Sequence, residues 1–123
     1  MKRFIDNKDG TVTDTDTNLM WQKDTAPDKY AWEKAVKYCR ELELGGHNDW
    51  RLPTVHELHS IIDYSRINPA TDPIFGAKSS YYWSFTPYAG DPDGAWYVNF
   101  YNGDVYYGVK SGHDYVRAVR AGS

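Results

Sequence analysis

The chain has 123 residues, a formal net charge of −3 at pH 7, and aromatic side chains at 16% of its positions. A chain of this length closes one hydrophobic core, so we expect a single domain over residues 1–123. Because the balance is acidic and lysines and arginines do not cluster, nucleic acid is not an expected partner. No apolar run is long enough to span a membrane, so membrane insertion is not expected either.

The N-terminal segment predicts a β-hairpin and a further strand. Residues 4–6 and 11–14 flank a turn with an Asp-Gly pair, which suits a positive φ angle, and residues 18–22 follow as a short strand. Several oxygen-bearing side chains lie in or near the hairpin: Asp6, Asn7, Asp9, Asp14 and Asp16. Calcium needs about six to eight converging oxygens, and Lys8 within the turn favours an ordinary hairpin.

An amphipathic helix is predicted from residue 29 to about residue 42. Apolar side chains recur there at spacings of three and four, and Asp28 is the expected N-cap. Cys39 is the only cysteine and falls on the apolar stripe of this helix. We therefore expect a buried structural thiol, and a single cysteine excludes an internal disulfide and a four-cysteine metal site.

A second helix is predicted to begin at Thr54 and to run to about residue 64. Thr54 and Glu57 have the spacing of a capping box, in which each residue satisfies a main-chain amide of the other. Arg51, which precedes a Leu-Pro pair, is expected to place a buried guanidinium on backbone carbonyls. An irregular loop should follow over residues 65–80.

The last third of the chain is expected to be β. Its predicted strands are residues 82–84, 95–100, 105–107 and 115–120. Alternation in the second of these places Trp96 on one face and Tyr97 on the other. An N-terminal hairpin, two helices and then antiparallel strands define an α+β domain, in which the two helices pack on a twisted sheet.

The stretch YNGDVYYGVKSGHD, residues 101–114, is rich in tyrosine and in small polar residues. Antibody loops use a similar palette, because tyrosine gives stiff contact area while glycine, serine and asparagine adapt. The candidate binding surface comprises Phe85, Tyr88, Asp91, Asp93, Tyr97, Tyr101, Asp104, Tyr106, Tyr107, Gly108, Ser111, His113 and Asp114. Alternatively, the rings only cover core edges and the polar residues form solvated turns.

No catalytic or metal-binding motif is evident in the sequence. His56 and His59 are three residues apart, but a zinc site needs three or four converging ligands. Asp91-Pro92-Asp93 only loosely resembles the sugar-binding triplets of calcium-dependent lectins. Neither a nucleophile elbow nor a phosphate-binding glycine loop is present. We therefore expect a protein that is not an enzyme and has neither metal nor cofactor.

Seven motifs in a fixed order cover nearly the whole chain: DNKDGTVTD, NLMWQ, AWEKAVKYC, GGHNDWRLPTVHEL, YYWSF, AWYVNFYNG and YVRAVR. In this order they resemble the family of the C-terminal domain of the Legionella collagen-like adhesin, which is found in bacteria and phages. The resemblance implies a C-type-lectin-like fold. DWRLPT also resembles the formylglycine-generating-enzyme branch of that fold, but those enzymes hold copper with paired cysteines that this chain lacks.

The composition of residues 101–114, enclosed by AWYVNF and YVRAVR, is also similar to that of the variable proteins of diversity-generating retroelements. In those proteins, mutation at adenines turns AAC-type codons into codons for Asn, Tyr, Asp, Ser, Gly and His. This resemblance implies a surface whose residues differ among related copies.

The expected function is recognition of a protein or glycan on another cell or particle. One alternative is a glycosaminoglycan-binding adhesin, for which Lys110, Arg117 and Arg120 are the main cations in this region. Another is a structural module of a virion tail or surface fibre, and an oligomer fits either. These functions place the protein at a cell surface or virion, although the start of the sequence has no apolar stretch of signal-peptide length.

Overall fold

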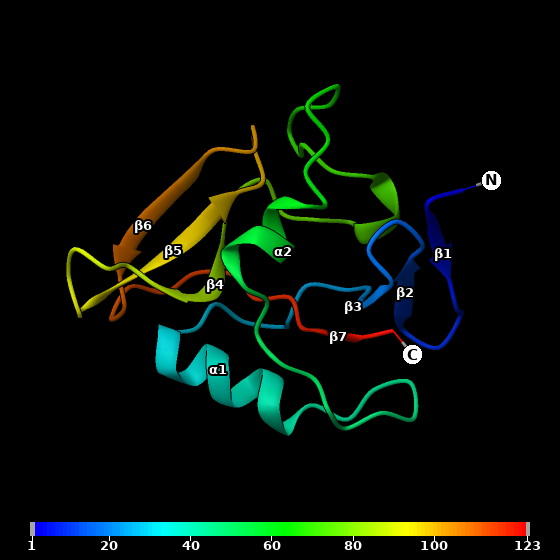
Figure 1. Ribbon diagram of the computed structural model, residues 1–123, viewed down its shortest axis with the longest axis horizontal. Helices are drawn as coiled ribbons and strands as arrows, with labels where there is room; N and C mark the ends of the chain where they lie inside the picture. The colour runs from blue at the N-terminus through cyan, green and yellow to red at the C-terminus, as the bar shows by residue number, and fades with distance from the viewer. Residues whose placement is uncertain (1, 123) are drawn as a thin grey trace.

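The computed structural model describes residues 2–122 and arranges them in two antiparallel sheets and two α-helices (Figure 1). The first sheet has the order β1-β2-β3-β7, with strands Phe4–Asp6, Thr11–Asp14, Leu19–Gln22 and Val119–Ala121. The second has the order β4-β5-β6, with strands Tyr81–Pro87, Gly94–Asn99 and Val105–Val109. The helices are α1, Trp32–Glu41, and α2, Val55–His59, and a 3-10 turn spans Pro73–Phe75.

This arrangement is the α+β, C-type-lectin-like fold that the sequence predicts, with helices packed against antiparallel strands. The strands form two sheets rather than one. Helix α2 lies between the sheets, and α1 runs along one side of the molecule (Figure 1). In the described part of the chain, neither helix is long and apolar enough to cross a membrane.

The N-terminal hairpin is confirmed, because β1 pairs with β2 in antiparallel register. Three carboxylates close its turns: Asp6, Asp9 and Asp14 each accept a hydrogen bond from the main-chain amide two residues further on. Asp14 is buried and also accepts two hydrogen bonds from Arg3, each of 2.9 Å. Desolvation alone would raise the pKa of the Asp14 carboxyl. The hydrogen bonds that this carboxyl accepts, first of all from Arg3, outweigh desolvation together and lower the pKa. These acidic side chains therefore stabilise the hairpin and its turns.

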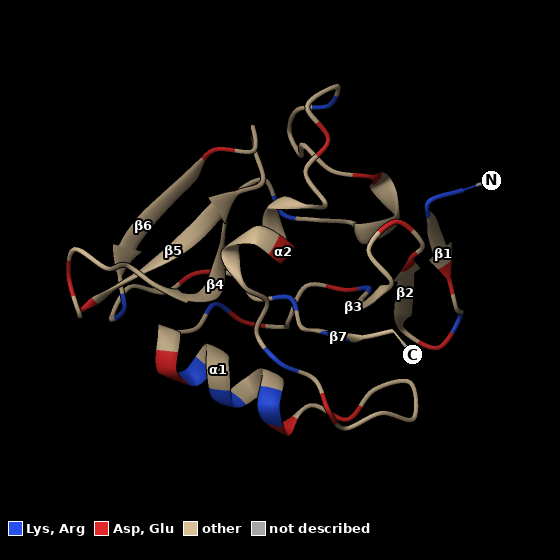
Figure 2. Ribbon diagram, in the orientation of Figure 1, with Lys and Arg blue, Asp and Glu red and all other residues tan. Residues whose placement is uncertain are grey.

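Helix α1 begins at Trp32 with Ala31 as its N-cap, so the predicted N-cap Asp28 is wrong. The reason is tertiary. Tyr30 and Asp114 exchange two main-chain hydrogen bonds of 2.9 and 3.1 Å, which hold the chain extended before the helix. Charged residues follow one another along α1, whereas β5 and β6 carry none (Figure 2).

Helix α2 confirms the predicted capping box. The Thr54 hydroxyl accepts from the amide of Glu57, and the Glu57 carboxylate accepts from the amide of Thr54. The helix ends at His59, earlier than predicted, because Ile62 then pairs with Thr71 in an isolated bridge and the chain becomes extended. The irregular segment after α2 contains the 3-10 turn.

The last predicted strand, residues 115–120, is mostly a crossing segment. Tyr115 forms a bridge with Tyr82 in the second sheet, whereas β7 begins only at Val119 in the first sheet. The chain therefore passes from one sheet to the other over residues 115–118.

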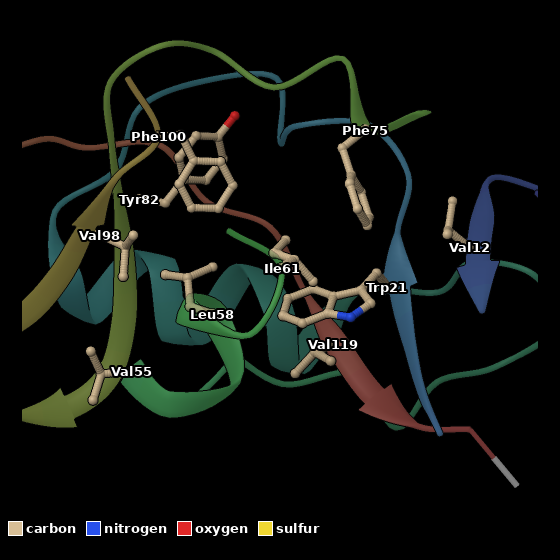
Figure 3. Close-up of a cluster of buried hydrophobic side chains, with 10 residues drawn as sticks. All are labelled: Val12, Trp21, Val55, Leu58, Ile61, Phe75, Tyr82, Val98, Phe100 and Val119. Carbon is tan, nitrogen blue, oxygen red and sulfur yellow. The ribbon is translucent and has the colours of Figure 1, made fainter. Parts of the chain in front are cut away.

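The core consists of two neighbouring clusters, and Figure 3 shows the first of them. Leu58 and Ile61 lie between the stacked rings of Tyr82 and Phe100, whose centroids are 4.4 Å apart, and the indole of Trp21. Aromatic rings thus provide much of the buried volume, as the high aromatic content leads one to expect.

The second cluster packs α1 against the second sheet. Its buried members are Ala26, Ala35, Cys39, Trp50, Leu52, Trp83, Ala95, Val116 and Ala118. The thiol of Cys39 is fully buried, as predicted, and burial raises its pKa to about 12. A thiol with so high a pKa stays protonated and unreactive near neutral pH.

Arg51 does not supply the buried guanidinium that the sequence predicts. Its side chain is 45% exposed and pairs with the carboxylate of Glu57 at 2.6 Å. The buried guanidinium belongs to Arg117, which is 0% exposed and donates to the carbonyl oxygens of Gln22 and Phe75 at 2.7 and 2.9 Å. The expected type of interaction exists, but on a different arginine.

Candidate binding surface

The second sheet carries aromatic side chains on both of its faces. Successive residues of a strand point to opposite faces, so Trp96 and Tyr97 of β5 mark the two sides, which we call face A and face B respectively. In cross-strand register, Trp96 lies opposite Tyr107 and Tyr97 lies opposite Tyr106. Tyr106 is 57% exposed and Tyr107 is 36% exposed, so these rings of β6 lie at the surface.

Face A is formed by three interlocked rings and two valines. The ring of Tyr88 stacks on that of Tyr107 with a centroid distance of 3.8 Å and an interplanar angle of 4°. Trp96 meets both rings edge-on, at 5.3 and 5.8 Å. Val105 and Val109 flank Tyr107 on the same face and are 41% and 58% exposed. The result is an apolar, aromatic patch whose rings hold one another in place.

Face B is centred on Tyr97. Its ring stacks on Tyr81 at 4.4 Å and leans on the buried Trp83 at 5.5 Å, and burial raises the pKa of its hydroxyl. On the neighbouring strand, a Cβ at Gly108 would lie only 2.5 Å from the Tyr97 ring, so glycine leaves the space that this ring occupies. Tyr106 lies beside Tyr97 on the same face and is more exposed.

Phe85 belongs to a third patch, next to α1. Its ring stacks on Trp32 with centroids 5.8 Å apart, and the ammonium of Lys110 lies 4.5 Å above the same indole. Phe85 also borders an apolar pocket of about 340 Å³, which Trp50 and Leu52 line on the other side. The structure therefore separates Phe85 from the rings of faces A and B.

The remaining predicted residues lie in turns at the ends of the sheet. Asp91 and Asp93 are exposed in the turn between β4 and β5, where the Asp93 amide donates to the Asp91 carboxylate at 2.9 Å. Asp104 lies at the opposite end, in the turn between β5 and β6, and its amide donates to Asn102 at 3.0 Å. Tyr101, 44% exposed, is in that same turn. Ring-rich faces are thus bordered by polar turns.

Ser111, His113 and Asp114 follow β6, and the Asp114 side chain is half-buried. Burial raises the pKa of its carboxyl to about 6, although Lys29 and His113 oppose the shift. Its main chain pairs with Tyr30 in the bridge that precedes α1. Asp114 therefore contributes to the frame that holds the sheet, and its side chain titrates in an accessible pH range.

Asp114→Asn should change how stability depends on pH. In the folded state the Asp114 carboxyl has a pKa of about 6 against an ordinary value of 3.8, so folding favours its protonated form. The contribution of this group to stability is therefore largest below about pH 4. That contribution is lost as the pH rises through about 6. The full shift corresponds to about 3 kcal/mol, and because the Asp114 side chain is only partly buried, solvent screening reduces this, so relative to wild type the variant should gain roughly 2 kcal/mol between about pH 4 and pH 7. Urea unfolding across this range measures the difference, and parallel curves would contradict the expectation.

Sequence reasoning missed several members of the surface. Trp96, Val105 and Val109 were not among the predicted residues, although each forms part of face A. The alternation in β5 correctly predicted that Trp96 and Tyr97 lie on opposite faces, but Trp96 was not included in the candidate surface. The signal that could have found the valines is the strand VYYGV itself, which contains no charged residue.

The cations proposed for a sulfated ligand are mostly unavailable. Arg117 is fully buried, and Arg120 is 8% exposed and paired with Asp49 at 2.6 Å. Lys110 remains at the surface, where it caps Trp32 and donates to the carbonyl of Pro92 at 2.9 Å. Figure 2 shows no run of Lys and Arg over β4, β5 and β6.

The structure gives the histidines of α2 a local role. His59 shares a hydrogen bond of 2.6 Å with the Tyr64 hydroxyl, while His56 is exposed. Over residues 2–122, no three His, Cys, Asp or Glu side chains converge in a way that could hold a metal ion. The acidic hairpin residues have the hydrogen-bonding roles described above.

Residues 10–120 match the family described as the Lcl C-terminal domain, and the chain belongs to this family. The match spans nearly the whole sequence and agrees with the resemblance carried by the ordered motifs. No curated protein matches the chain. Membership of this family indicates an adhesin-type binding module for external ligands.

Proposed function

We propose that the domain is a non-enzymatic recognition module that binds a protein or glycan on another cell or particle through faces A and B. One observation carries the proposal: the rings of Tyr106 and Tyr107 are exposed, although other aromatic rings of the chain, such as those of Trp21, Tyr82 and Phe100, are fully buried. Tyrosine rings give large contact area and lose little rotamer freedom on binding. Membership of an adhesin-type family supports the same reading.

Contacts with other rings, one of them buried, hold the tyrosine rings of faces A and B in place. This favours a binding role over the alternative that these rings only cover the edges of the core. The Tyr97 ring rests on the buried Trp83, and Tyr107 is held by Tyr88 and Trp96. Rings that are already fixed need no ordering when a partner arrives, so more of the contact energy appears as affinity. The polar turns at both ends supply a rim with adaptable hydrogen-bonding groups.

The test is a combined replacement of Tyr101, Tyr106, Tyr107 and His113 by alanine. Ligands are first found by screening the wild-type domain on arrays of defined glycans and of purified surface proteins. The combined variant should bind such a ligand at least tenfold more weakly, because a few anchors, often tyrosines, carry most of an interface's binding free energy, about 2 kcal/mol or more at each hot spot. Surface plasmon resonance measures the affinity.

Ile5→Ala is the control, because this residue is apolar and 45% exposed but lies on the first sheet. It should leave the affinity unchanged. Circular dichroism and urea unfolding check that both proteins fold. Unchanged ligand binding by the folded combined variant would overturn the assignment of these faces, and so would unfolding of that variant.

Three finer readings are tested separately. A glycosaminoglycan ligand would give retention on heparin that falls steeply with salt; the burial or pairing of Arg117 and Arg120 makes a protein or uncharged glycan the preferred class. A diversity-generating retroelement would leave a reverse transcriptase gene and an adenine-rich template copy near the coding DNA of residues 101–114. A fibre module would form a trimer or larger assembly that buries the tyrosines.

A further inference from the structure

Strand β6 is a free edge of the second sheet. It pairs with β5 alone, and Figure 1 shows nothing beside its outer edge. The amide of Asn99 donates to the carbonyl of Asp104 at 2.8 Å, and the amide of Lys110 donates to the carbonyl of Asp93 at 2.7 Å. These two bonds show which residues next to β5 and β6 form hydrogen-bonded pairs. Because antiparallel ladders alternate, even-numbered residues of β6 turn their N–H and C=O groups toward β5. The odd-numbered residues of the strand turn theirs outward.

These outward groups are available for pairing. Over residues 2–122, the outward main-chain groups of Val105 and Tyr107 have no main-chain partner outside the sheet ladder and no side-chain partner, while the Val109 carbonyl accepts from Gly112 at 2.9 Å. Natural proteins protect free edges with charges, prolines, bulges or very short strands. The sequence VYYGV has none of these over its length, and all its residues except Gly108 are exposed.

The other free edge of the molecule, β1, provides a contrast. It has only three residues, and one of them, Asp6, is charged, whereas β6 contains no charged residue. That edge has the usual protection, whereas the edge of β6 does not. A strand of this kind is suited to pairing with a further strand.

We propose that β6 pairs with β6 of a second copy of this chain, antiparallel and with the two-fold axis at Tyr107. In that register Tyr107 faces itself, and Val105 faces Val109 of the second copy. Asp104 then lies opposite Lys110 of the second copy, and the same contact occurs again across the axis. Opposite charges directly across a ladder stabilise pairing, and like charges oppose it.

The chemistry of β6 fits this register on three counts. Over residues 2–122, neither Asp104 nor Lys110 forms an ion pair within the chain. Gly108 would face Tyr106 of the second copy, and it leaves room for a ring there as it does for Tyr97 within the chain. Both outward groups of Tyr107 would be satisfied by the same residue of the second copy.

The dimer would contain one continuous six-stranded sheet, so faces A and B of the two copies would adjoin. Binding to a surface with repeated ligands would then gain from two linked sites. The pairing itself does not rest on the proposed ligand binding. The two proposals can therefore fail separately. A monomer that binds ligand would contradict only the pairing, and a dimer that binds no ligand would contradict only the proposed recognition function.

The first test removes only an outward N–H. Val105→Pro cannot donate from the free edge, yet it spares the β5 ladder, because prolines are tolerated on edge strands. Val105→Thr is the matched control that keeps the N–H and favours a strand. Analytical ultracentrifugation from about 1 to 500 µM should give a dimer for wild type and for Val105→Thr. Val105→Pro should raise the dimer dissociation constant at least tenfold.

The second test reads the register. Lys110→Asp should weaken the dimer several-fold by placing two aspartates opposite each other, and the double variant Asp104→Lys with Lys110→Asp should restore it. Urea unfolding at low protein concentration checks each monomer. Amide hydrogen exchange at Val105 and Tyr107 should slow as the concentration rises. A wild-type monomer throughout, or a dimer unaffected by Val105→Pro, would overturn the proposal.

Discussion

Replacing Arg117 by methionine is expected to lower the free energy of unfolding by about 3–5 kcal/mol. The fully buried guanidinium donates hydrogen bonds to four acceptors, which are the carbonyl oxygens of Gln22, Lys23 and Phe75 and the hydroxyl of Thr25. Methionine keeps an unbranched apolar stem but is shorter than arginine and has no hydrogen-bond donor. Each buried acceptor that loses its partner costs about 1–3 kcal/mol.

The expected loss is smaller than the sum of these bonds because burial of a cation is itself unfavourable. Desolvation lowers the pKa of Arg117, and no carboxylate pairs with it among residues 2–122. The rings of Phe75 and Tyr82 lie 5.1 and 5.8 Å from the guanidinium carbon and offset part of that cost. Arg117 thereby ties the crossing segment to the end of β3, to the residues after it and to the 3-10 turn.

Two further variants separate hydrogen bonding from charge and size. Arg117→Lys keeps the charge, but its compact ammonium cannot reach all the acceptors that the planar guanidinium spans, so it should recover only part of the loss. Arg66→Met removes an arginine that is 45% exposed and paired with Asp63, and it should change stability by less than about 0.5 kcal/mol. Urea unfolding measured by tryptophan fluorescence gives the values. A loss below about 1 kcal/mol for Arg117→Met would contradict the assigned role.

Local sequence rules predicted the elements whose structure depends on near neighbours. The hairpin at Asp9-Gly10 and the capping box of Thr54 and Glu57 both formed as expected, because turn and cap geometry is set within a few residues. The start of α1 was wrong because Tyr30 pairs with Asp114, which is remote in sequence. No spacing of apolar residues carries that information.

The two arginines show the same limit. Arg51 precedes a Leu-Pro pair and was expected to be the buried arginine, whereas Arg117 in YVRAVR was expected to be one of the cations open to a sulfated ligand. The chain crosses between the sheets at Arg117, so both sides of that segment are buried. A polar residue in an alternating pattern faces solvent only when one side of the strand is open.

The candidate site was predictable as a composition but not as a geometry. The residue composition of the segment 101–114 indicated exposed rings, and Tyr101, Tyr106 and Tyr107 are exposed. Their division between faces A and B depends on the register of β5 with β6, and the support of Tyr97 depends on a β4 strand with an irregular register after Trp83. Such irregularities leave no clear mark in a single sequence.

Replacing Trp83 by alanine should cost about 3–5 kcal/mol of folding free energy, comparable with the loss of Arg117. The indole is fully buried, and its N–H donates to the carbonyl of Tyr30 at 2.9 Å, while its main-chain amide donates to Tyr115 at 3.0 Å. Trp83 thus fastens β4 to the segment before α1 and to the crossing segment. A domain of this length has a total stability of roughly 6–18 kcal/mol, so the loss is a large share of it.

Trp83→Phe is the milder variant, expected to cost about 1–2 kcal/mol, because the Tyr30 carbonyl still accepts from the Asp114 amide at 3.1 Å. Since the Tyr97 ring rests on this indole at 5.5 Å, the two side chains should be energetically coupled. A double-mutant cycle of Trp83→Phe with Tyr97→Leu, measured by urea unfolding, should give a coupling of about 0.5–1.5 kcal/mol. Strict additivity would mean that the core does not hold face B in place, which removes the physical reason for a rigid binding surface there.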